Sequence, residues 1–288
     1  MELSGSRVLV TGGSRGIGEA LARRFGAEGA RVALVARSAA AIDQLAAELG
    51  GTAHAADLTD PRQVGGLVER IEAEGGPVDV LVNNAGMEGV GTFDDETAED
   101  LEHLFRLNLL TPAELTRQVL PGMLRRGRGH LVNISSLAGC AVFPGMASYS
   151  SSKAGLSQLT AGLRADLRGT SIGTTLVELG PIPTEMLDRV EGCEPVRASF
   201  QRLYRLRLLV DVDREVVART VVDAVRAGRR HVRHPKRALA FPLLTEAPRR
   251  VVELLLTGVQ ARVGAPDEQV IDLRDETSVS RAPEAGPR

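Results

Sequence analysis

Tryptophan is absent from this chain of 288 residues, and tyrosine, lysine and cysteine each occur only twice. The two cysteines, Cys140 and Cys193, have neither a disulfide-framework pattern nor metal-ligand spacing, so we expect free thiols, no metal and a reducing cytoplasm. No apolar run reaches the roughly 18 residues of a spanning helix, and no secretion signal precedes the first apolar strand. The net charge of −2 and the lack of a recognition motif argue against nucleic acid as a partner. These absences favour a cytoplasmic globular protein.

One tyrosine and one lysine lie four positions apart, as Tyr149 and Lys153 with three serines between them. The other basic residues are almost all arginine, so a lysine here indicates a need for more than a positive charge. In a helix this spacing puts both side chains on one face. A nearby ammonium favours the phenolate, so we expect the phenol to titrate below its usual pKa of about 10 and to exchange a proton with an alcohol or carbonyl. A helix turn without function is the alternative.

Short β-branched runs alternate with longer segments rich in alanine, leucine, glutamate and arginine. The expected strands are 7–11, 31–36, 52–56, 78–83, 130–135, 171–178 and 231–233. The expected helices are 16–28, 39–49, 62–74, 98–110, 112–126, 148–168 and 214–227, with one or two more within 184–209. Such alternation predicts an α/β fold with a doubly wound parallel sheet, in which ligands bind at the carboxyl ends of the strands.

A glycine-rich loop, Thr11 to Gly18, lies where the first strand should turn into the first helix. Glycines at 12, 16 and 18 allow a tight turn and close approach of the backbone to a ligand. The helix N-terminus then offers unpaired N–H groups to a pyrophosphate, so a dinucleotide is expected here.

The second expected strand ends in Ala36 and Arg37, without the acidic residue that usually binds a free ribose hydroxyl. Arg15 adds a second guanidinium on the loop. Guanidinium groups suit a 2′-phosphate, so NADP(H) is favoured, with NAD(H) as the alternative.

Several motifs together resemble the classical short-chain dehydrogenases/reductases, over about residues 5 to 235. They are the glycine loop, Asn83-Asn84-Ala85-Gly86, Asn108, Ser136 with Tyr149 thirteen positions later, and the Tyr149–Lys153 pair. The resemblance implies a Rossmann-type sheet in a single domain and an oxidoreductase that acts on CH–OH and C=O groups.

The resemblance also implies a role for each matching residue. Tyr149 matches the acid/base, Lys153 the residue that lowers its pKa and binds the nicotinamide ribose, and Ser136, rather than Ser135, the hydroxyl that orients the substrate oxygen. Asn108 matches the asparagine that supports a water in the proton relay. The implied cofactor contacts are Gly12, Ser14, Arg15, Gly16, Ile17, Gly18, Arg37, Asp57, Leu58, Asn84, Tyr149, Lys153, Ile182 and Thr184. One departure is Leu179, which stands where the family usually has proline.

Apolar residues dominate the two segments that form the substrate pocket in the family. They are Leu137, Cys140, Val142, Phe143, Met146, Met186, Leu187, Val190, Phe200, Leu203, Tyr204 and Leu206. An apolar lining favours a hydrophobic ketone or secondary alcohol, such as a steroid, a lipid or a polyketide-like ring; plain packing of the covering helices is the alternative. Competing functions are a 3-oxoacyl-thioester reductase of the same family, a non-catalytic nucleotide sensor and a membrane-surface binding protein.

The end of the chain departs from the alternating pattern. We expect the nucleotide-binding domain to span residues 1–240, an amphipathic extension 241–263, and a polar, flexible tail 264–288. Basic residues within 229–237, followed by apolar segments 239–244 and 251–256, would suit peripheral contact with an anionic membrane; contact between subunits is the alternative. Family precedent implies a homodimer or homotetramer.

Overall fold

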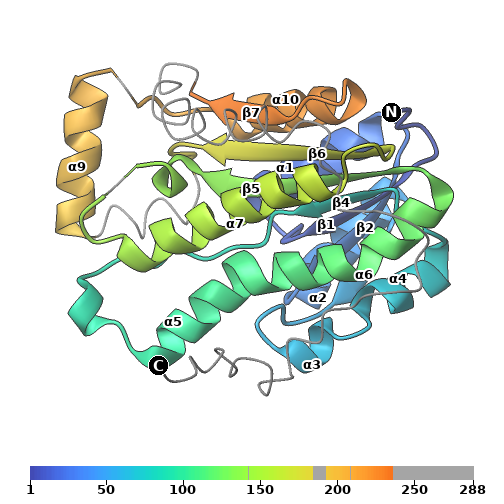
Figure 1. Cartoon of the computed structure of the whole chain (residues 1–288), viewed down its shortest axis with the longest axis horizontal. Coiled ribbons are helices and arrows are strands. Elements are labelled where there is room, and N and C mark those ends of the chain that lie inside the picture. Colours follow the sequence, from blue (N-terminus) through green and yellow to red (C-terminus); the bar gives the residue numbers. More distant parts are fainter. Residues whose placement is uncertain (142, 184–192, 208, 236–288) are drawn as a thin grey trace, which may run out of the picture.

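The computed structural model describes residues 1–141, 143–183, 193–207 and 209–235. In this part of the chain, seven parallel strands form one sheet in the order β3-β2-β1-β4-β5-β6-β7 (Figure 1). Their bounds are β1 Arg7–Thr11, β2 Arg31–Ala36, β3 Thr52–Ala55, β4 Val80–Asn83, β5 Gly129–Ser136, β6 Ile172–Leu179 and β7 His231–His234. The order changes direction between β1 and β4, and in open parallel sheets ligands bind at the carboxyl ends of the strands at such a switch point. The predicted doubly wound α/β fold is confirmed.

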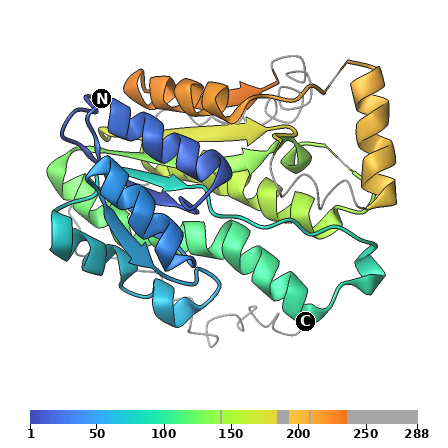
Figure 2. The same cartoon turned by 180° about the vertical axis from the view of Figure 1, so that it is seen from behind.

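Helices cover both faces of the sheet (Figures 1 and 2). The α-helices are α1 Gly16–Ala27, α2 Ala39–Leu49, α3 Pro61–Val64, α4 Leu67–Gly75, α5 Ala98–Phe105, α6 Thr111–Arg126, α7 Ala147–Asp166, α9 Glu194–Arg205 and α10 Arg214–Arg226. Short turns are η1 Phe93–Asp95, η2 Arg106–Leu110 and η3 Leu137–Gly139. Side chains from α1, α2 and α10 form the core on one face, and side chains from α3, α4 and α6 form the core on the other.

The strands are apolar on both sides because both sides are covered. In β1, Val8 and Val10 belong to one core cluster and Leu9 to the other, and all three are fully buried. Successive side chains of a strand point to opposite faces, so a continuous apolar run fills both cores at once.

Two expected helices are interrupted in the structure. The expected helix 62–74 divides into α3 and α4 because Gly65 and Gly66 lie between them, and Gly66 has φ of +65°. The expected helix 98–110 ends as α5 at Phe105 and continues through a π-helical turn, η2, into α6. Pro112 has no N–H to donate to the carbonyl of Asn108 four residues earlier, so regular α-helical bonding cannot pass through this point.

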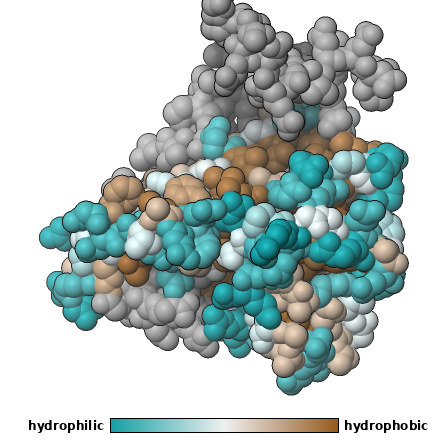
Figure 3. All heavy atoms as spheres, turned by 90° about the horizontal axis from the view of Figure 1, so that it is seen from below, coloured by the Kyte–Doolittle hydropathy of each residue, from teal (hydrophilic) through white to brown (hydrophobic). Residues whose placement is uncertain are grey.

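Within the described ranges, no helix is long and apolar enough to cross a membrane, and no three metal-binding side chains gather together. Hydrophilic side chains cover most of the described surface in the view of Figure 3. Thr184, Met186, Leu187, Val190, the segments 241–263 and 264–288 and the apolar segments of the expected membrane contact lie outside the described residues, as does Val142.

Candidate active site

Tyr149 is the third residue of α7, and the start of this helix lies beside the carboxyl end of β5 (Figure 1). Its phenol interacts with the side chain of Ser136, the last residue of β5, and this interaction lowers the pKa of the phenol. The Ser136 hydroxyl donates to the carbonyl of Leu179 at 3.3 Å and accepts from the N–H of Ala138 at 3.1 Å. The fold thus fixes the Ser136 oxygen between two backbone groups and directs it toward the phenol.

The neighbouring Ser135 points away from this pair. Its hydroxyl is buried, donates to the carbonyl of Lys153 at 3.0 Å and contacts the hydroxyl of Ser157 at 2.8 Å. Strand alternation explains the difference, because Ser135 and Ser136 must face opposite sides of the sheet. Ser135 therefore binds β5 to α7, and Ser136 alone of the two meets Tyr149.

Lys153 lies one turn after Tyr149 and is 5% exposed. Its Nζ atom donates to the carbonyl of Ile134 at 3.1 Å and lies 6.0 Å from the centre of the Tyr149 ring. Burial lowers the pKa of Lys153 to about 8, because the ammonium has left water. A Cβ placed on Gly86 would lie 3.2 Å from this Nζ and 3.1 Å from the Asn108 side-chain oxygen, so the backbone at Gly86 closes over both residues.

The expected fall in the pKa of Tyr149 does not occur in this structure. Burial raises the pKa of the phenol, the bond to Ser136 lowers it, and the negative charge of Glu88 raises it further. Lys153 does not lower the pKa of the phenol, because its ammonium is bonded to the Ile134 carbonyl and lies over the ring rather than at the phenol oxygen. The expectation was wrong because sequence spacing gives no information on solvent exclusion.

Asn108 is fully buried in the π-helical turn η2. Its side-chain oxygen accepts from the N–H of Met87 at 2.9 Å, and its Nδ2 donates to the carbonyl of Met87 at 2.9 Å and to the hydroxyl of Ser152 at 3.1 Å. The Asn108 amide therefore ties the segment after β4 to α7. π-Helical turns are frequent at functional sites.

The glycine loop connects β1 to α1 as expected. A Cβ on Gly18 would lie 2.1 Å from the carbonyl oxygen of Gly12 and 2.6 Å from Nδ2 of Asn84, so no side chain fits there. Asn84 donates through Nδ2 to the carbonyl of Thr11 at 2.9 Å. Ser14, Arg15, Gly16 and Ile17 lie on this loop or at the first turn of α1, with Arg15 exposed at the helix N-cap.

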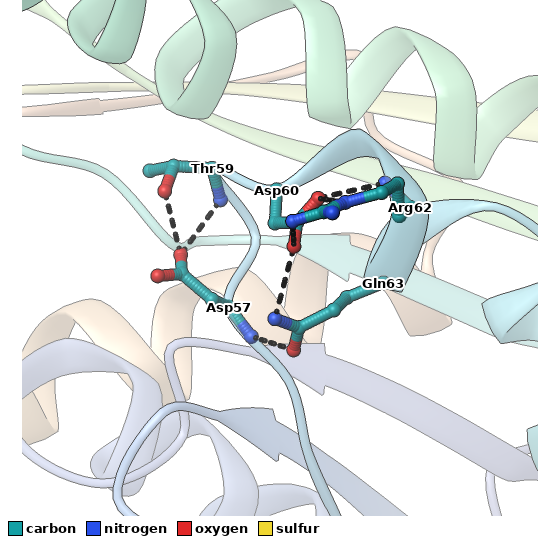
Figure 4. Close-up of polar contacts among 5 residues, drawn as sticks. All are labelled: Asp57, Thr59, Asp60, Arg62 and Gln63. Atoms are coloured by element: carbon teal, nitrogen blue, oxygen red, sulfur yellow. Dashed lines mark hydrogen bonds and ion pairs between the residues drawn. The ribbon is translucent and has the colours of Figure 1, made fainter.

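Arg37 and Asp57 follow β2 and β3 at the same edge of the sheet. Arg37 is exposed, and its positive charge contributes to lowering the pKa of Asp57, after the bonds from Thr59. One Asp57 carboxylate oxygen accepts from the N–H and the hydroxyl of Thr59, and Figure 4 shows the other oxygen turned away from them. The Arg37 guanidinium therefore lies near the turn from Asp57 to Thr59, which is stabilised by the hydrogen bonds to the Asp57 carboxylate.

The residues behind this edge are buried. Leu58 is 4% exposed, and its carbonyl accepts from the hydroxyl of Thr111 at 2.6 Å, while Ile182 is 6% exposed and belongs to the core. Leu179, in the position where proline was expected, is buried in the same core and supplies the carbonyl that accepts from Ser136.

The comparison with protein-family models agrees with this arrangement: the model described as short chain dehydrogenase matches residues 6–193. The chain belongs to the short-chain dehydrogenase family. Members of this family are oxidoreductases that act on keto and hydroxyl groups.

Curated relatives and solved structures agree with this membership. The ketoacyl reductase HetN of Nostoc sp. is 41% identical over 180 residues, 61% of this chain and 63% of HetN. The oxidoreductase UcpA of Salmonella typhimurium is 34% identical over 222 residues, 73% of this chain and 84% of UcpA. The match thus spans less than two thirds of HetN and of a short chain dehydrogenase from Pseudocercospora fijiensis, 63% and 62% of their lengths. A short-chain dehydrogenase from Sphingobium yanoikuyae in complex with NADPH superposes with a TM-score of 0.73 and 28% identity, covering 90% of this chain and 98% of that chain.

In this short-chain dehydrogenase, an apolar cluster adjoins Tyr149. Buried Leu137, Met146, Val196, Phe200 and Leu209 form its centre. Phe143, Leu203 and Tyr204 pack against it, and the rings of Phe143 and Phe200 meet edge to face at 5.6 Å. The structure therefore gathers six of the expected pocket residues, whereas Leu206 is 61% exposed and the Cys140 thiol donates to Glu178 at 3.0 Å instead.

Sequence reasoning missed Ser152, which connects two of the expected catalytic residues. Its hydroxyl donates to the carbonyl of Tyr149 at 2.7 Å and accepts from Asn108 at 3.1 Å, and its exposure is 0%. The spacing in the sequence could have identified Ser152, because residues three apart in a helix lie on one face and Ser152 follows Tyr149 by three positions. Glu88 and Met87 had no such signal, since they act on Tyr149 and Asn108 from a different segment.

Proposed function

We propose that this chain is an NADP(H)-dependent oxidoreductase that interconverts a carbonyl and a secondary alcohol on a hydrophobic substrate. The observation that carries the proposal is the phenol of Tyr149 held against the Ser136 hydroxyl, with buried Lys153 and Asn108 behind it. A phenol, a hydroxyl and an ammonium at the end of a parallel sheet form a proton donor, an orienting group and a cation beside the expected dinucleotide site.

Each residue has a distinct task in the proposed reaction. Ser136 donates to the substrate oxygen and fixes its position, and Tyr149 gives that oxygen a proton as the carbonyl becomes CH–OH. In the proposed reaction the Lys153 ammonium leaves the Ile134 carbonyl and stabilises the negative charge that develops on the phenol oxygen, and Asn108 positions the segments on either side. When bound, NADPH supplies the hydride to the carbonyl carbon and leaves as NADP⁺.

The residues at the nucleotide edge fit this cofactor. The backbone at Gly12 and Gly18 lies so close to Asn84 that only a loop without side chains is possible, and such a loop can approach a pyrophosphate. We propose that Ser14, Arg15, Gly16 and Ile17 bind the phosphates with these glycines, and that Arg37 binds the 2′-phosphate. Asp57, Leu58, Asn84, Ile182 and Thr184 would then surround the adenine, the ribose and the carboxamide, and NAD(H) is the alternative.

The preference for NADPH should depend on Arg37. Replacement of Arg37 by alanine removes a charge-assisted bond to the 2′-phosphate, so we expect NADPH affinity to fall about 30-fold, or about 2 kcal/mol, with NADH affinity unchanged. Titration followed by nicotinamide fluorescence measures both. Arg31→Ala is the matched control, because Arg31 is exposed at the opposite end of the same strand. Equal losses for the two nucleotides would refute the assignment of Arg37.

The pH dependence should report Lys153. Burial places its pKa at about 8, so the residue is a cation below that pH and neutral above it. Because only the cation stabilises the developing phenolate, we expect kcat/KM for carbonyl reduction to fall as pH rises through about 8. Arginine keeps its positive charge over this pH range. Any activity left in Lys153→Arg should therefore not fall as pH rises through about 8. A wild-type profile that stays level to pH 9.5 (about 1.5 units above that pKa) would contradict the assignment.

A hydrophobic substrate is supported by the apolar cluster around Tyr149. One relative, HetN, is named a ketoacyl reductase, which favours a 3-oxoacyl thioester as the second candidate substrate. Turnover of a panel of hydrophobic ketones and 3-oxoacyl thioesters with NADPH tests the proposal directly, and binding of NADPH without any turnover would favour a non-catalytic nucleotide sensor.

We further propose a homodimer or homotetramer that pairs through the helices around Asn108 and Tyr149. Leu110, one of three large exposed apolar residues in the described ranges, lies on η2 with 48% of its surface accessible. We also propose a nucleotide-binding domain over residues 1–240, an extension over 241–263 and a tail over 264–288, with peripheral membrane contact through the basic end. Light scattering gives the subunit number, and vesicle sedimentation of a chain ending at Pro235 tests the membrane contact.

A further inference from the structure

Three arginines at the end of α9 differ from most other surface arginines of this protein. Arg202, Arg205 and Arg207 are exposed, and none has an ion pair or side-chain hydrogen bond to another residue that the structure describes. Several other exposed arginines are paired with acids, as Arg23 is with Glu48 and Arg117 with Glu114, and others donate to backbone carbonyls, as Arg31 does to Gly75. We call Arg202, Arg205 and Arg207 the α9 arginine patch.

The local sequence explains why the patch lacks acidic neighbours along the chain. No aspartate or glutamate occurs between Glu194 and Asp211, and Glu194 is already paired with Arg197 on the first turn of the helix. The nearest acid beyond the patch, Asp211, accepts from the hydroxyl of Tyr204 at 2.5 Å. Positive charge therefore accumulates at the C-terminal end of α9 in a chain whose net charge is −2.

The patch adjoins the candidate active site through its own helix. Leu203 and Tyr204, which lie between Arg202 and Arg205, pack against the apolar cluster that includes Tyr149. The α9 helix stands at the end of the sheet where β6 and β7 finish, as both views show (Figures 1 and 2). The last turn of α9 and the two residues after it thus carry both apolar side chains beside Tyr149 and three exposed guanidinium groups.

Two further features mark this end of α9 as a contact surface. Leu206, between Arg205 and Arg207, is 61% exposed, one of the three large apolar side chains so exposed in the described ranges. Arg207 is the one non-glycine residue with positive φ there, at 56°, a conformation that is costly for a residue with a side chain. An exposed leucine set among guanidinium groups suits a ligand that is anionic and partly apolar.

We propose that the α9 arginine patch binds the phosphate groups of a carrier to which the substrate is attached as an acyl thioester, as in coenzyme A. This inference rests on the proposed function and names the class of its substrate. The acyl chain would enter the apolar cluster beside Tyr149, the linker would pass Leu206, and the phosphates would bind the guanidinium groups, which suit phosphate oxygens in bidentate geometry.

The test compares two thioesters of the same 3-oxoacyl chain, one on coenzyme A and one on neutral N-acetylcysteamine. In the full-length variant Arg202→Gln/Arg205→Gln, we expect KM for the coenzyme A thioester to rise about tenfold, with kcat and the KM of the neutral thioester unchanged. Added salt should raise KM for the coenzyme A thioester in the wild type and do so less in the variant. Arg197→Gln is the matched control, because Arg197 lies on the same helix but is paired with Glu194.

Several outcomes would overturn the inference. Basic residues in the last turn also stabilise a helix, and a purely structural role would lower thermal stability while changing both thioesters equally. Loss of binding to phosphatidylglycerol vesicles, with unchanged kinetics on coenzyme A thioesters, would assign the patch to a membrane surface instead. Reduction of hydrophobic ketones but of neither thioester would refute the carrier and leave the proposed function intact, whereas no reduction of any carbonyl compound would refute both.

Discussion

Replacement of Tyr149 by phenylalanine should lower kcat for carbonyl reduction by about 10²- to 10⁴-fold, the usual contribution of a positioned general acid. The change removes one oxygen and leaves the ring in its apolar cluster, so the packing around Leu137 and Met146 is preserved. The Ser136 hydroxyl keeps its bonds to Leu179 and Ala138. Since the phenol is the proposed proton donor, the loss should fall on kcat, while NADPH affinity measured by fluorescence stays near the wild-type value.

The chain supplies a matched control for this experiment. Tyr204, the second tyrosine, adjoins the same apolar cluster, but its hydroxyl bonds Asp211. Tyr204→Phe removes the same atom from the same kind of residue, so we expect a small change in kcat. A Tyr149→Phe enzyme that turns over at the wild-type rate, or equal losses in both variants, would show that Tyr149 is not the acid.

Replacement of Gly18 by alanine should strongly weaken cofactor binding and destabilise the protein. The added Cβ would lie 2.1 Å from the carbonyl oxygen of Gly12 and 2.8 Å from its carbonyl carbon, and these backbone atoms cannot move without opening the loop. We expect NADPH affinity to fall by about 100-fold or more and the free energy of unfolding by about 3 kcal/mol, at the upper end of typical overpacking costs. Fluorescence titration and chemical denaturation measure the two effects.

Gly162 provides the opposite case on α7. A Cβ there meets no atom within 4 Å, and the residue is exposed in the C-terminal part of the helix, before its last turn. Gly162→Ala should therefore stabilise the protein by about 0.5–1 kcal/mol through the higher helix propensity of alanine, and leave NADPH binding unchanged. If Gly18→Ala behaved like Gly162→Ala, the glycine loop would not have the close-packed geometry on which the cofactor proposal depends.

Much of the fold follows from local sequence patterns. The bounds predicted for the first two strands and the second helix agree with β1, β2 and α2 to the residue, because glycine or polar residues mark most ends of these apolar β-branched and Ala/Leu-rich segments. Errors arose where a helical pattern continued through residues that interrupt the backbone, at Gly65–Gly66 and ahead of Pro112. The glycine pair and the proline are visible in the sequence. Whether either residue interrupts a helix depends on the hydrogen bonds that the neighbouring backbone can form instead.

The candidate site shows the same division. The spacing of Tyr149 and Lys153 places them on one helix face, and the pattern of the glycine loop locates the nucleotide edge. The family resemblance favours Ser136 over Ser135, but the physical reason depends on the pairing of β5 with β6 and its covering by α7. Ser152, Met87 and Glu88 became part of the site because segments far apart in the chain meet there.

The sequence by itself determined the order of strands and helices, the position of the glycine loop and the pairing of a phenol with an ammonium on one helix face. These depend on backbone preferences and on spacing within one segment, which neighbouring residues specify. Only the tertiary structure decided that burial raises the pKa of Tyr149 and brings that of Lys153 to about 8, and that α9 carries unpaired arginines beside the apolar cluster. Solvent exclusion and charge pairing depend on distances between segments that the chain brings together only on folding.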